Sequence, residues 1–139
     1  MESNSRILLV DDEENLLQVL SLMLLEIGWP AATASCAEDA LRMVKEERYQ
    51  FAIIDNQLGT LSGIDLIDKI GMADPDLPCI LMTGDLNVDA TTRALKRGAA
   101  GFLRKPFRIE ELLVSIQQAR RERELRQKQR ELTGLCAQK

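Results

Sequence analysis

The stretch that most constrains the fold of this chain is Phe51–Asp55, in which four apolar residues lead directly into an aspartate. An apolar run this short, with two adjacent β-branched isoleucines, is typical of a buried strand in a parallel sheet. A second run, at residues 7–10, also ends in acid, at residues 11–14. The carboxyl ends of parallel strands share one edge of the sheet, where open α/β folds bind ligands. The two runs therefore predict carboxylates gathered at one edge of a buried sheet.

Short apolar runs alternate with helical patterns along the rest of the chain. Strands are expected at residues 6–10, 31–34, 51–54, 79–82 and 101–104. The helices expected after them cover about residues 11–27, 36–47, 64–72, 88–97 and 109–132. This alternation predicts an α/β fold of the flavodoxin-like (βα)5 type, a three-layer sandwich around a parallel five-stranded sheet. The strand order would be 2-1-3-4-5, and its switch point between strands 1 and 3 would receive Asp11, Asp12 and Asp55.

Small residues mark the expected ends of several helices. Gly28 is placed at the carboxyl end of the first helix, a position that glycine often takes. Ser35, with Glu38 three residues later, predicts a capping box at the start of the second helix. Gly71 is expected near the end of the third helix, and Gly98 at the end of the fourth.

The length of 139 residues suggests one domain with a single core, and 45% hydrophobic and 29% charged residues are ordinary values for a globular protein. No apolar stretch reaches the length of a membrane helix, so no membrane association is expected. Residues 1–6 lack the basic segment of a signal peptide. We therefore expect a cytoplasmic protein.

The chain contains no histidine and three scattered cysteines, Cys36, Cys79 and Cys136. The missing histidine excludes catalysis by a histidine base or nucleophile, and it excludes this chain as its own phosphohistidine donor. A zinc site is not expected, because the cysteines form no paired motif. The cysteines are expected to be reduced thiols that act as small apolar side chains.

Charge is distributed unevenly along the chain. Residues 1–119 hold 11 basic and 19 acidic residues, whereas residues 120–139 hold 7 and 3. The net charges are therefore −8 and +4. We expect a folded domain over residues 1–119, followed by a charged helical extension or linker over residues 120–139. An acidic domain argues against nucleic-acid binding by this chain alone.

Three carboxylates at one edge repel one another, which disfavours their ionisation. Mg²⁺ relieves this repulsion, because it binds one or two carboxylates and leaves further positions for water and phosphate oxygens. Thr83 and Lys105 end the fourth and fifth strands and would add a hydroxyl donor and an ammonium at the same edge. Read alone, each of these residues has an ordinary role in a turn, a cap or the surface. Together they favour a site for phosphoryl transfer.

The ordered set Asp11-Asp12, Asp55, Thr83 and Lys105-Pro106-Phe107 resembles the receiver domain of the response regulators of two-component signal transduction. The resemblance covers about residues 5–120. It implies that Asp55 is the phospho-acceptor and that Lys105 pairs with the phosphoryl oxygens. It also implies that the Lys105–Pro106 peptide bond is often cis.

The resemblance further implies a Mg²⁺ site and a switch. Asp12 would bind the ion directly and Asp11 mostly through water, with Asp55 and the backbone carbonyl of Gln57 completing the protein ligands. On phosphorylation, Thr83 would move toward the phosphate and Phe102 would turn inward behind it. The surface of the fourth helix, fifth strand and fifth helix would then change.

The sequence departs from the usual family pattern in the loop after Asp55. A proline is usual four residues after the acceptor, where this chain has Gly59, and we expect the loop to be less rigid as a result. Gly63 is retained. Phe102 lacks the hydroxyl of a tyrosine, so a switch there would act by packing alone. Gln57 and Asp85 flank the site and are expected to tune the loss of the phosphoryl group.

The main interpretation is a receiver that accepts a phosphoryl group on Asp55 from a histidine kinase or phosphotransfer protein. It would be the N-terminal module of a transcriptional regulator, with no enzymatic activity beyond its own dephosphorylation. The alternatives are a stand-alone receiver in a phosphorelay, a constitutive binding domain with a degenerate site, and a small Mg²⁺-dependent phosphatase that uses an aspartate nucleophile. Such a phosphatase would need a second acid two residues after the nucleophile, and that position is Gln57.

The basic tail allows several interpretations. Leu125, Leu132 and Leu135 have heptad-like spacing, but Lys128 occupies the core position between the first two. The tail is therefore a dimer seam, a solvated continuation of the last helix, or the start of a linker to an output domain. A homodimer would form through this helix or through the surface of the fourth helix, fifth strand and fifth helix.

Overall fold

A computed structural model describes residues 6–59, 61–84 and 88–137 of the chain. Its strands are β1 (Ile7–Val10), β2 (Ala31–Ala34), β3 (Phe51–Asp55), β4 (Cys79–Thr83) and β5 (Gly101–Arg104). Its helices are α1 (Glu14–Glu26), α2 (Ala37–Glu46), α3 (Gly63–Ala73), α4 (Val88–Lys96) and α5 (Ile109–Ala137). All strand pairs are parallel and the order is β2-β1-β3-β4-β5, which confirms the predicted flavodoxin-like fold.

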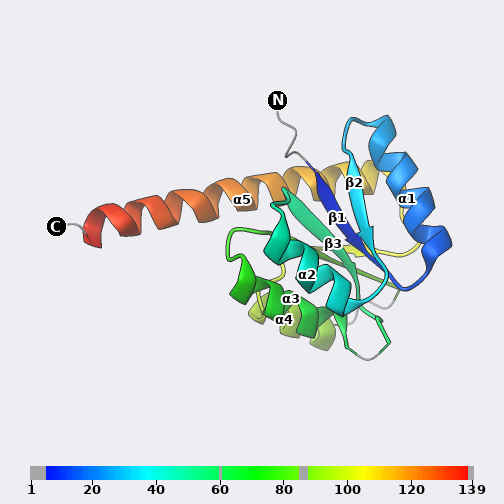
Figure 1. Ribbon diagram of the computed structural model, residues 1–139, viewed down its shortest axis with the longest axis horizontal. Coiled ribbons are helices and arrows are strands. Elements are labelled where there is room, and N and C mark those ends of the chain that lie inside the picture. Colours follow the sequence, from blue (N-terminus) through cyan, green and yellow to red (C-terminus); the bar gives the residue numbers. More distant parts are fainter. Residues whose placement is uncertain (1–5, 60, 85–87, 138–139) are drawn as a thin grey trace.

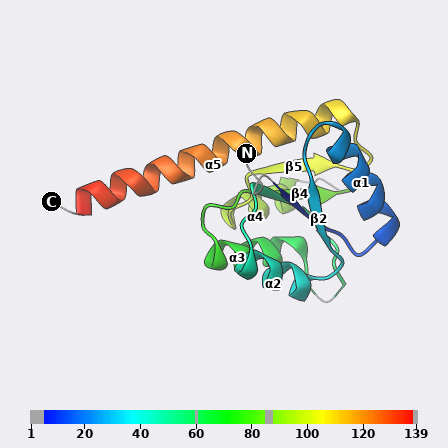
Figure 2. The same ribbon diagram turned by 45° about the horizontal axis from the view of Figure 1, so that its top comes forward.

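The helices cover both faces of the sheet. In Figures 1 and 2, α1 and α5 lie on one face and α2, α3 and α4 lie on the other. Side chains from alternate strand positions fill a separate core on each face, so that Leu8 and Ile54 pack toward α2 and α3 while Ile7 and Ile53 pack toward α1 and α5. Burial on both faces explains the uninterrupted apolar runs, and each buried leucine or isoleucine contributes about 1.5–3 kcal/mol.

One of the expected helix caps is wrong. The cap of α2 is Cys36, which is extended and makes no side-chain capping bond, so the helix begins one residue later than the Ser35–Glu38 box requires. Gly71 lies near the end of α3, as expected, and the helix closes after Ala73, where the Asp74 N–H donates to the carbonyl of Ile70 at 2.8 Å. Gly28 adopts a φ of 93° just after α1, the left-handed conformation expected at this end.

Helix α5 is longer than the sequence pattern predicts, since it continues to Ala137. It crosses residue 119 without a break and projects well beyond the body of the molecule (Figure 1). Among the described residues, no helix combines the length and the apolar character needed to span a membrane.

Cys79 lies in β4 with 2% of its surface exposed, and burial raises the pKa of its thiol to about 12. A thiol with so high a pKa is a poor nucleophile and a poor metal ligand at neutral pH. Cys36 is half-buried and unpaired. The states of Cys79 and Cys36 agree with the expectation of reduced, structural thiols. The side chain of Cys136 lies outside the described residues.

The two glycines of α3 give a matched pair of substitutions. A Cβ at Gly63 would lie 2.4 Å from the backbone oxygen of Asp55, whereas a Cβ at Gly71 would have no atom within 4 Å. We expect Gly63→Ala to lower the free energy of unfolding by about 1–3 kcal/mol, because the backbone at the end of β3 must shift. Gly71→Ala should raise it by about 0.5–1 kcal/mol, because alanine is the better helix former. Urea unfolding of both variants checks this, and equal effects would contradict it.

Candidate functional site

The carboxyl ends of four strands meet around one cavity of about 380 Å³. Asp11 and Asp12 directly follow β1, and Asp55 is the last residue of β3. Thr83 ends β4, and Lys105 directly follows β5. All five line the cavity, so the residues expected at one edge of the sheet do lie together.

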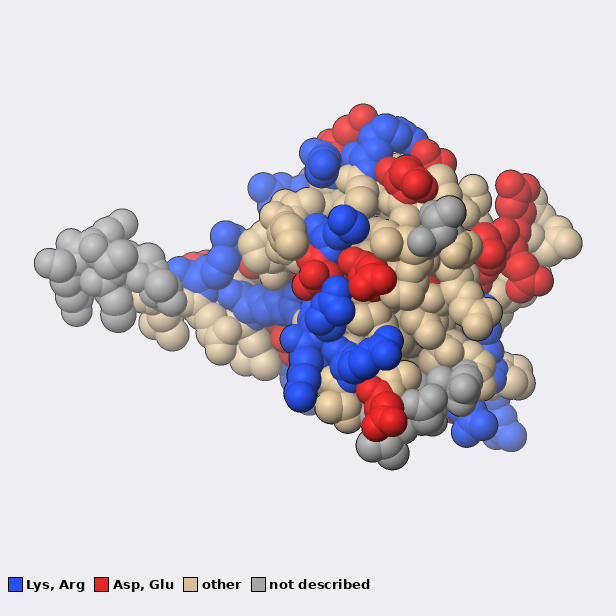
Figure 3. Space-filling view, turned by 90° about the horizontal axis from the view of Figure 1, so that it is seen from below, with Lys and Arg blue, Asp and Glu red and all other residues tan. Residues whose placement is uncertain are grey.

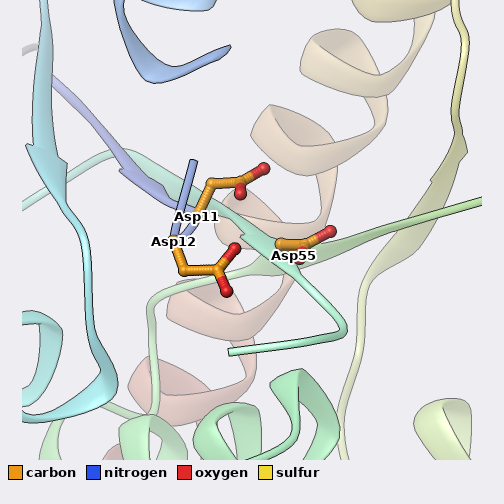
Figure 4. Close-up of side chains that lie close together, drawn as sticks. All are labelled: Asp11, Asp12 and Asp55. Carbon is orange, nitrogen blue, oxygen red and sulfur yellow. The ribbon is translucent and has the colours of Figure 1, made fainter. Parts of the chain in front are cut away.

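The three aspartates form a compact cluster. One carboxylate oxygen from each lies within 4.8 Å of the others, and Figure 4 shows Asp11 and Asp12 beside Asp55. Asp12 is exposed, but the side chains of Asp11 and Asp55 retain only 1% and 10% of their accessible surface. Two largely buried carboxylates this close together require compensating donors or cations.

Backbone N–H groups supply part of this compensation. The N–H of Glu13 donates to Asp11 Oδ1 at 2.9 Å, and the N–H of Gln57 donates to Asp55 Oδ2 at 3.2 Å. Burial still dominates at Asp11 and raises the pKa of its carboxyl group, with the charge of Asp55 acting in the same direction. The Glu13 N–H and the charge of Lys105 lower that pKa without cancelling the rise.

Lys105 is the cation of the cavity. Its Nζ lies 2.8 Å from Asp55 Oδ1 and 3.2 Å from Asp11 Oδ2, with 26% of the side chain exposed. Burial acts to lower the pKa of this ammonium, but its hydrogen bonds to and attraction by the two aspartates outweigh burial and raise the pKa. The Lys105 N–H donates to the carbonyl of Thr83 at 2.8 Å, and the Lys105–Pro106 bond is cis, as the family resemblance implied.

The conformation of the loop after Asp55 explains why glycine occupies positions 59 and 63. Gly63 passes so close to Asp55 that no side chain fits, and its N–H donates to the carbonyl of Asn56 at 2.8 Å. Gly59 has a φ of 83°, which a proline cannot adopt because its ring fixes φ near −65°. The departure from the family pattern at Gly59 is therefore accompanied by a loop conformation that requires glycine.

The two expected switch residues occupy different places. Thr83 is buried and lines the acidic cavity. Phe102 in β5 is half-buried and packs against the core on the side of α2 and α3. It also lines a second cavity, between α4 and α5, with Leu95 and Leu125. Asp85, expected to tune dephosphorylation, lies outside the described residues.

Some residues of the cavity were not singled out from the sequence. Glu13 contributes a backbone donor, and Asn56 and Gly84 complete the lining. The Asn56 side-chain oxygen is buried and has no hydrogen-bond partner within the described part of the chain. Their only sequence signal is their position next to Asp12, Asp55 and Thr83, because a backbone donor can come from any residue type.

The donor set fits a hard divalent cation. The cluster offers three carboxylate oxygens at a partly open cavity, and it is the only such group of acidic or thiol ligands found among the described residues. Mg²⁺ prefers oxygen ligands, uses one or two carboxylates and retains water. Asp11, Asp12 and Asp55 are thus the side chains suited to hold it.

Repulsion within the cluster gives a test that needs no ligand. Asp12→Asn should raise the melting temperature in EDTA by about 2–4 °C, because it removes one of three neighbouring negative charges. Excess Mg²⁺ should then stabilise the variant less than the wild type. Glu14→Gln is the matched control, since Glu14 is also exposed but belongs to the first turn of α1, where negative charge is favourable. An equal rise in both variants would contradict the electrostatic interpretation.

Comparison with known proteins supports the interpretation of this site. The family described as the response regulator receiver domain matches residues 7–117. The two-component response regulator ORR21 of Oryza sativa subsp. indica is 39% identical over 109 residues, which are 77% of this chain and 16% of that protein. The nitrogen assimilation regulatory protein NtrX of Azorhizobium caulinodans is 34% identical over 131 residues, which are 93% of this chain and 29% of that protein. The chain thus spans less than a third of the length of either.

Solved structures with a similar fold support the same family. The CheY-like receiver domain protein of Methanospirillum hungatei JF-1 has a TM-score of 0.81 and 28% identity, with 88% of this chain and 98% of that chain covered. A response regulator of Burkholderia pseudomallei, solved with a phosphorylated aspartic acid, calcium and citrate, has a TM-score of 0.77 and 28% identity over 88% of this chain and 72% of that chain. From the family match, the shared fold and the acidic edge of the sheet, it follows that the chain belongs to the response regulator receiver domain family.

Proposed function

We propose that this receiver accepts a phosphoryl group on Asp55 and passes the signal on by a change of surface. The observation that carries the proposal is the 2.8 Å contact between Lys105 Nζ and Asp55 Oδ1, in a cavity shared with Asp11 and Asp12. The contact places a cation beside the carboxylate, where the acyl phosphate that replaces it would carry about one further negative charge. A receiver domain implies a histidine kinase or a phosphotransfer protein as the donor, and this chain, which lacks histidine, cannot supply the phosphohistidine itself.

The reaction follows from the positions of the side chains. A carboxylate oxygen of Asp55 forms a bond to phosphorus while the bond from phosphorus to the donor's imidazole nitrogen breaks, and that nitrogen keeps the electron pair. Lys105 neutralises charge on the phosphoryl oxygens, and the Gln57 N–H helps to orient the Asp55 carboxylate. Mg²⁺, when bound by Asp11, Asp12, Asp55 and the Gln57 carbonyl, supplies charge neutralisation and alignment of the phosphoryl oxygens.

The switch would use the residues behind the cavity. Thr83 would donate its hydroxyl to a phosphoryl oxygen, and Phe102, half-buried beside α4, would fill the space that this movement opens. The surface of α4, β5 and α5 would change as a result. Such a switch shifts populations between two arrangements only as far as the phosphoryl group interacts differently with each.

A switch without further catalysis is the favoured role. A phosphatase that forms an aspartyl phosphate would want a second acid two residues after its nucleophile, and Gln57 stands there. Besides Asp55, the described lining of the cavity includes the acids Asp11, Asp12 and Glu13, and none of them stands two residues after the nucleophile. We therefore propose that hydrolysis is limited to the protein's own phosphoryl group.

The output is proposed to be control of transcription by a longer protein. NtrX and ORR21 are regulators several times longer than this chain, and the helix α5 would lead from residues 1–119 into the charged extension at 120–139. A stand-alone receiver in a phosphorelay is the alternative. Dimerisation is proposed through α4, β5 and α5 or through the exposed Leu125 and Leu132 of α5. On the face shown in Figure 3, basic and acidic side chains lie side by side. The net charge of −8 over residues 1–119 argues against nucleic-acid binding by this chain alone.

Intact mass after incubation with acetyl phosphate and Mg²⁺ tests the proposal. We expect the wild type to gain one phosphoryl group, and Asp55→Asn or a sample in EDTA to gain none. Asp65→Asn is the matched control, since Asp65 is a half-exposed aspartate on α3 and pairs with Arg97 at 3.0 Å, away from the cavity. It should gain the phosphoryl group as the wild type does.

Other outcomes would each change the interpretation. No gain in any sample would leave a constitutive binding domain. Rapid consumption of acetyl phosphate without a trapped adduct would favour the phosphatase. A gain that persists in Asp55→Asn would place the acceptor elsewhere.

A further inference from the structure

The part of α5 beyond residue 119 is not a free extension. It runs along the edge of the sheet opposite the acidic cavity, where three loops lead into β3, β4 and β5 (Figures 1 and 2). Three arginines of this segment, Arg123, Arg126 and Arg130, contact the loops, and we call them the arginine clamp. Residues 120–137 continue α5, as one of the alternatives for the tail expected, and the three arginines add contacts that none of the alternatives included.

Arg126 makes the broadest contact of the clamp. Its Nη1 lies 3.2 Å from the carbonyl oxygen of Leu77 and 3.4 Å from that of Pro75, both before β4. Its Nη2 donates to the carbonyl of Gly98, before β5, at 3.1 Å, and its Nε donates to Glu122 at 3.0 Å. The side chain is only 23% exposed. A planar guanidinium with five N–H donors can serve several acceptors at once, which a lysine cannot do in the same geometry.

The other two arginines extend the contact. Arg123 donates to the carbonyl of Tyr49, before β3, at 3.0 Å and to that of Asp76 at 3.5 Å. Arg130 pairs with the Asp76 carboxylate at 2.5 Å, and the side chain of Asp76 is 5% exposed. Loss of Arg130 would leave a buried carboxylate without this cation, a costly arrangement. Three loops are thus joined to one helix.

Helix α4 buries few of its described side chains. Among residues 89–96, only Ala94 is buried. Arg97, just past the helix, pairs with Asp65 and Asp68 of α3 at 3.0 and 3.3 Å, but these side chains are about half exposed, and such pairs contribute little. The bond from Arg126 to Gly98 therefore ties the carboxyl end of α4 to α5.

We propose that the arginine clamp restrains α4 and so couples the position of the α5 extension to the switch. The proposal rests on the proposed function, in which α4 belongs to the surface that changes on phosphorylation. The clamp is formed here with Asp55 paired to Lys105, and in this proposal it is weaker once Asp55 is phosphorylated. By linkage, loss of the clamp favours the phosphorylated arrangement, and phosphorylation in turn loosens the extension.

Hydrogen exchange on the full chain tests the clamp without phosphate. In Arg126→Ala, we expect amides of residues 74–78, 97–100 and 120–132 to exchange about three- to tenfold faster, as the loss of one or two hydrogen bonds requires. Lys128→Ala is the matched control, since Lys128 is an exposed base on the same helix with no ion pair among the described contacts. Arg126→Lys keeps the charge but not the fork of donors, and it should also accelerate exchange.

Phosphorylation kinetics then test the coupling. With acetyl phosphate and Mg²⁺, Arg126→Ala and Arg126→Lys should take up the phosphoryl group about fivefold faster than the wild type, whereas Lys128→Ala should not differ. In the phosphorylated wild type, exchange at residues 120–132 should rise toward that of the Arg126 variants. If Arg126→Ala fails to fold, Arg126→Lys carries both measurements.

The outcomes separate the two proposals. Unchanged exchange in both Arg126 variants, or the same change in Lys128→Ala, would overturn the clamp. Faster exchange with phosphorylation at the wild-type rate would overturn the coupling. A wild type that takes no phosphoryl group would overturn the proposed function and the coupling with it, while the exchange data would still decide whether the clamp exists.

Discussion

The pairing of one ammonium with two carboxylates is the interaction on which the acidic edge depends. Lys105 contacts Asp55 at 2.8 Å and Asp11 at 3.2 Å, and the three residues come from the ends of three different strands. A parallel sheet is what places those ends together, and without the lysine two largely buried carboxylates would face each other with backbone N–H donors alone. The same pairing also leaves the site ready for more negative charge, because a cation is already in place.

At the opposite edge of the sheet, the contacts are mainly hydrogen bonds to backbone carbonyl groups rather than ion pairs between side chains. There the loops before β3, β4 and β5 present backbone carbonyl groups, and arginines from α5 donate to them. At the acidic edge, carboxylate side chains that the sequence places close together attract a cation. At the opposite edge, arginine side chains donate to backbone carbonyl groups, which every residue carries. The two edges are joined by strands of four or five residues, of which β1, β3 and β4 are fully buried, and by α4. Among these elements α4 is the weakly packed one. We therefore expect α4 to move most readily when the structure at either edge changes.

The difference between the edges explains how much the sequence could predict. The strand ends and their side chains were predictable, because apolar runs that end in Asp11, Asp55, Thr83 and Lys105 fix both the sheet and the site. The contacts of Arg126 were not, since a carbonyl acceptor leaves no mark on the sequence. The start of α2 was missed because the backbone at Cys36, rather than the Ser35 side chain, decides where the helix begins. The conformation at Gly59 is likewise a property of the folded loop.

The uninterrupted course of α5 has a mechanical consequence. A helix rises 1.5 Å per residue, so 29 residues form a rod of about 43 Å, much of it beyond the sheet. About 27 Å of it follows residue 119, and a tilt of about 10° at that point would displace the far end by about 5 Å. A change of a fraction of an ångström at the base is thereby magnified along the rod. The helix acts as a lever arm whose stiffness, rather than any new contact, would carry a movement outward.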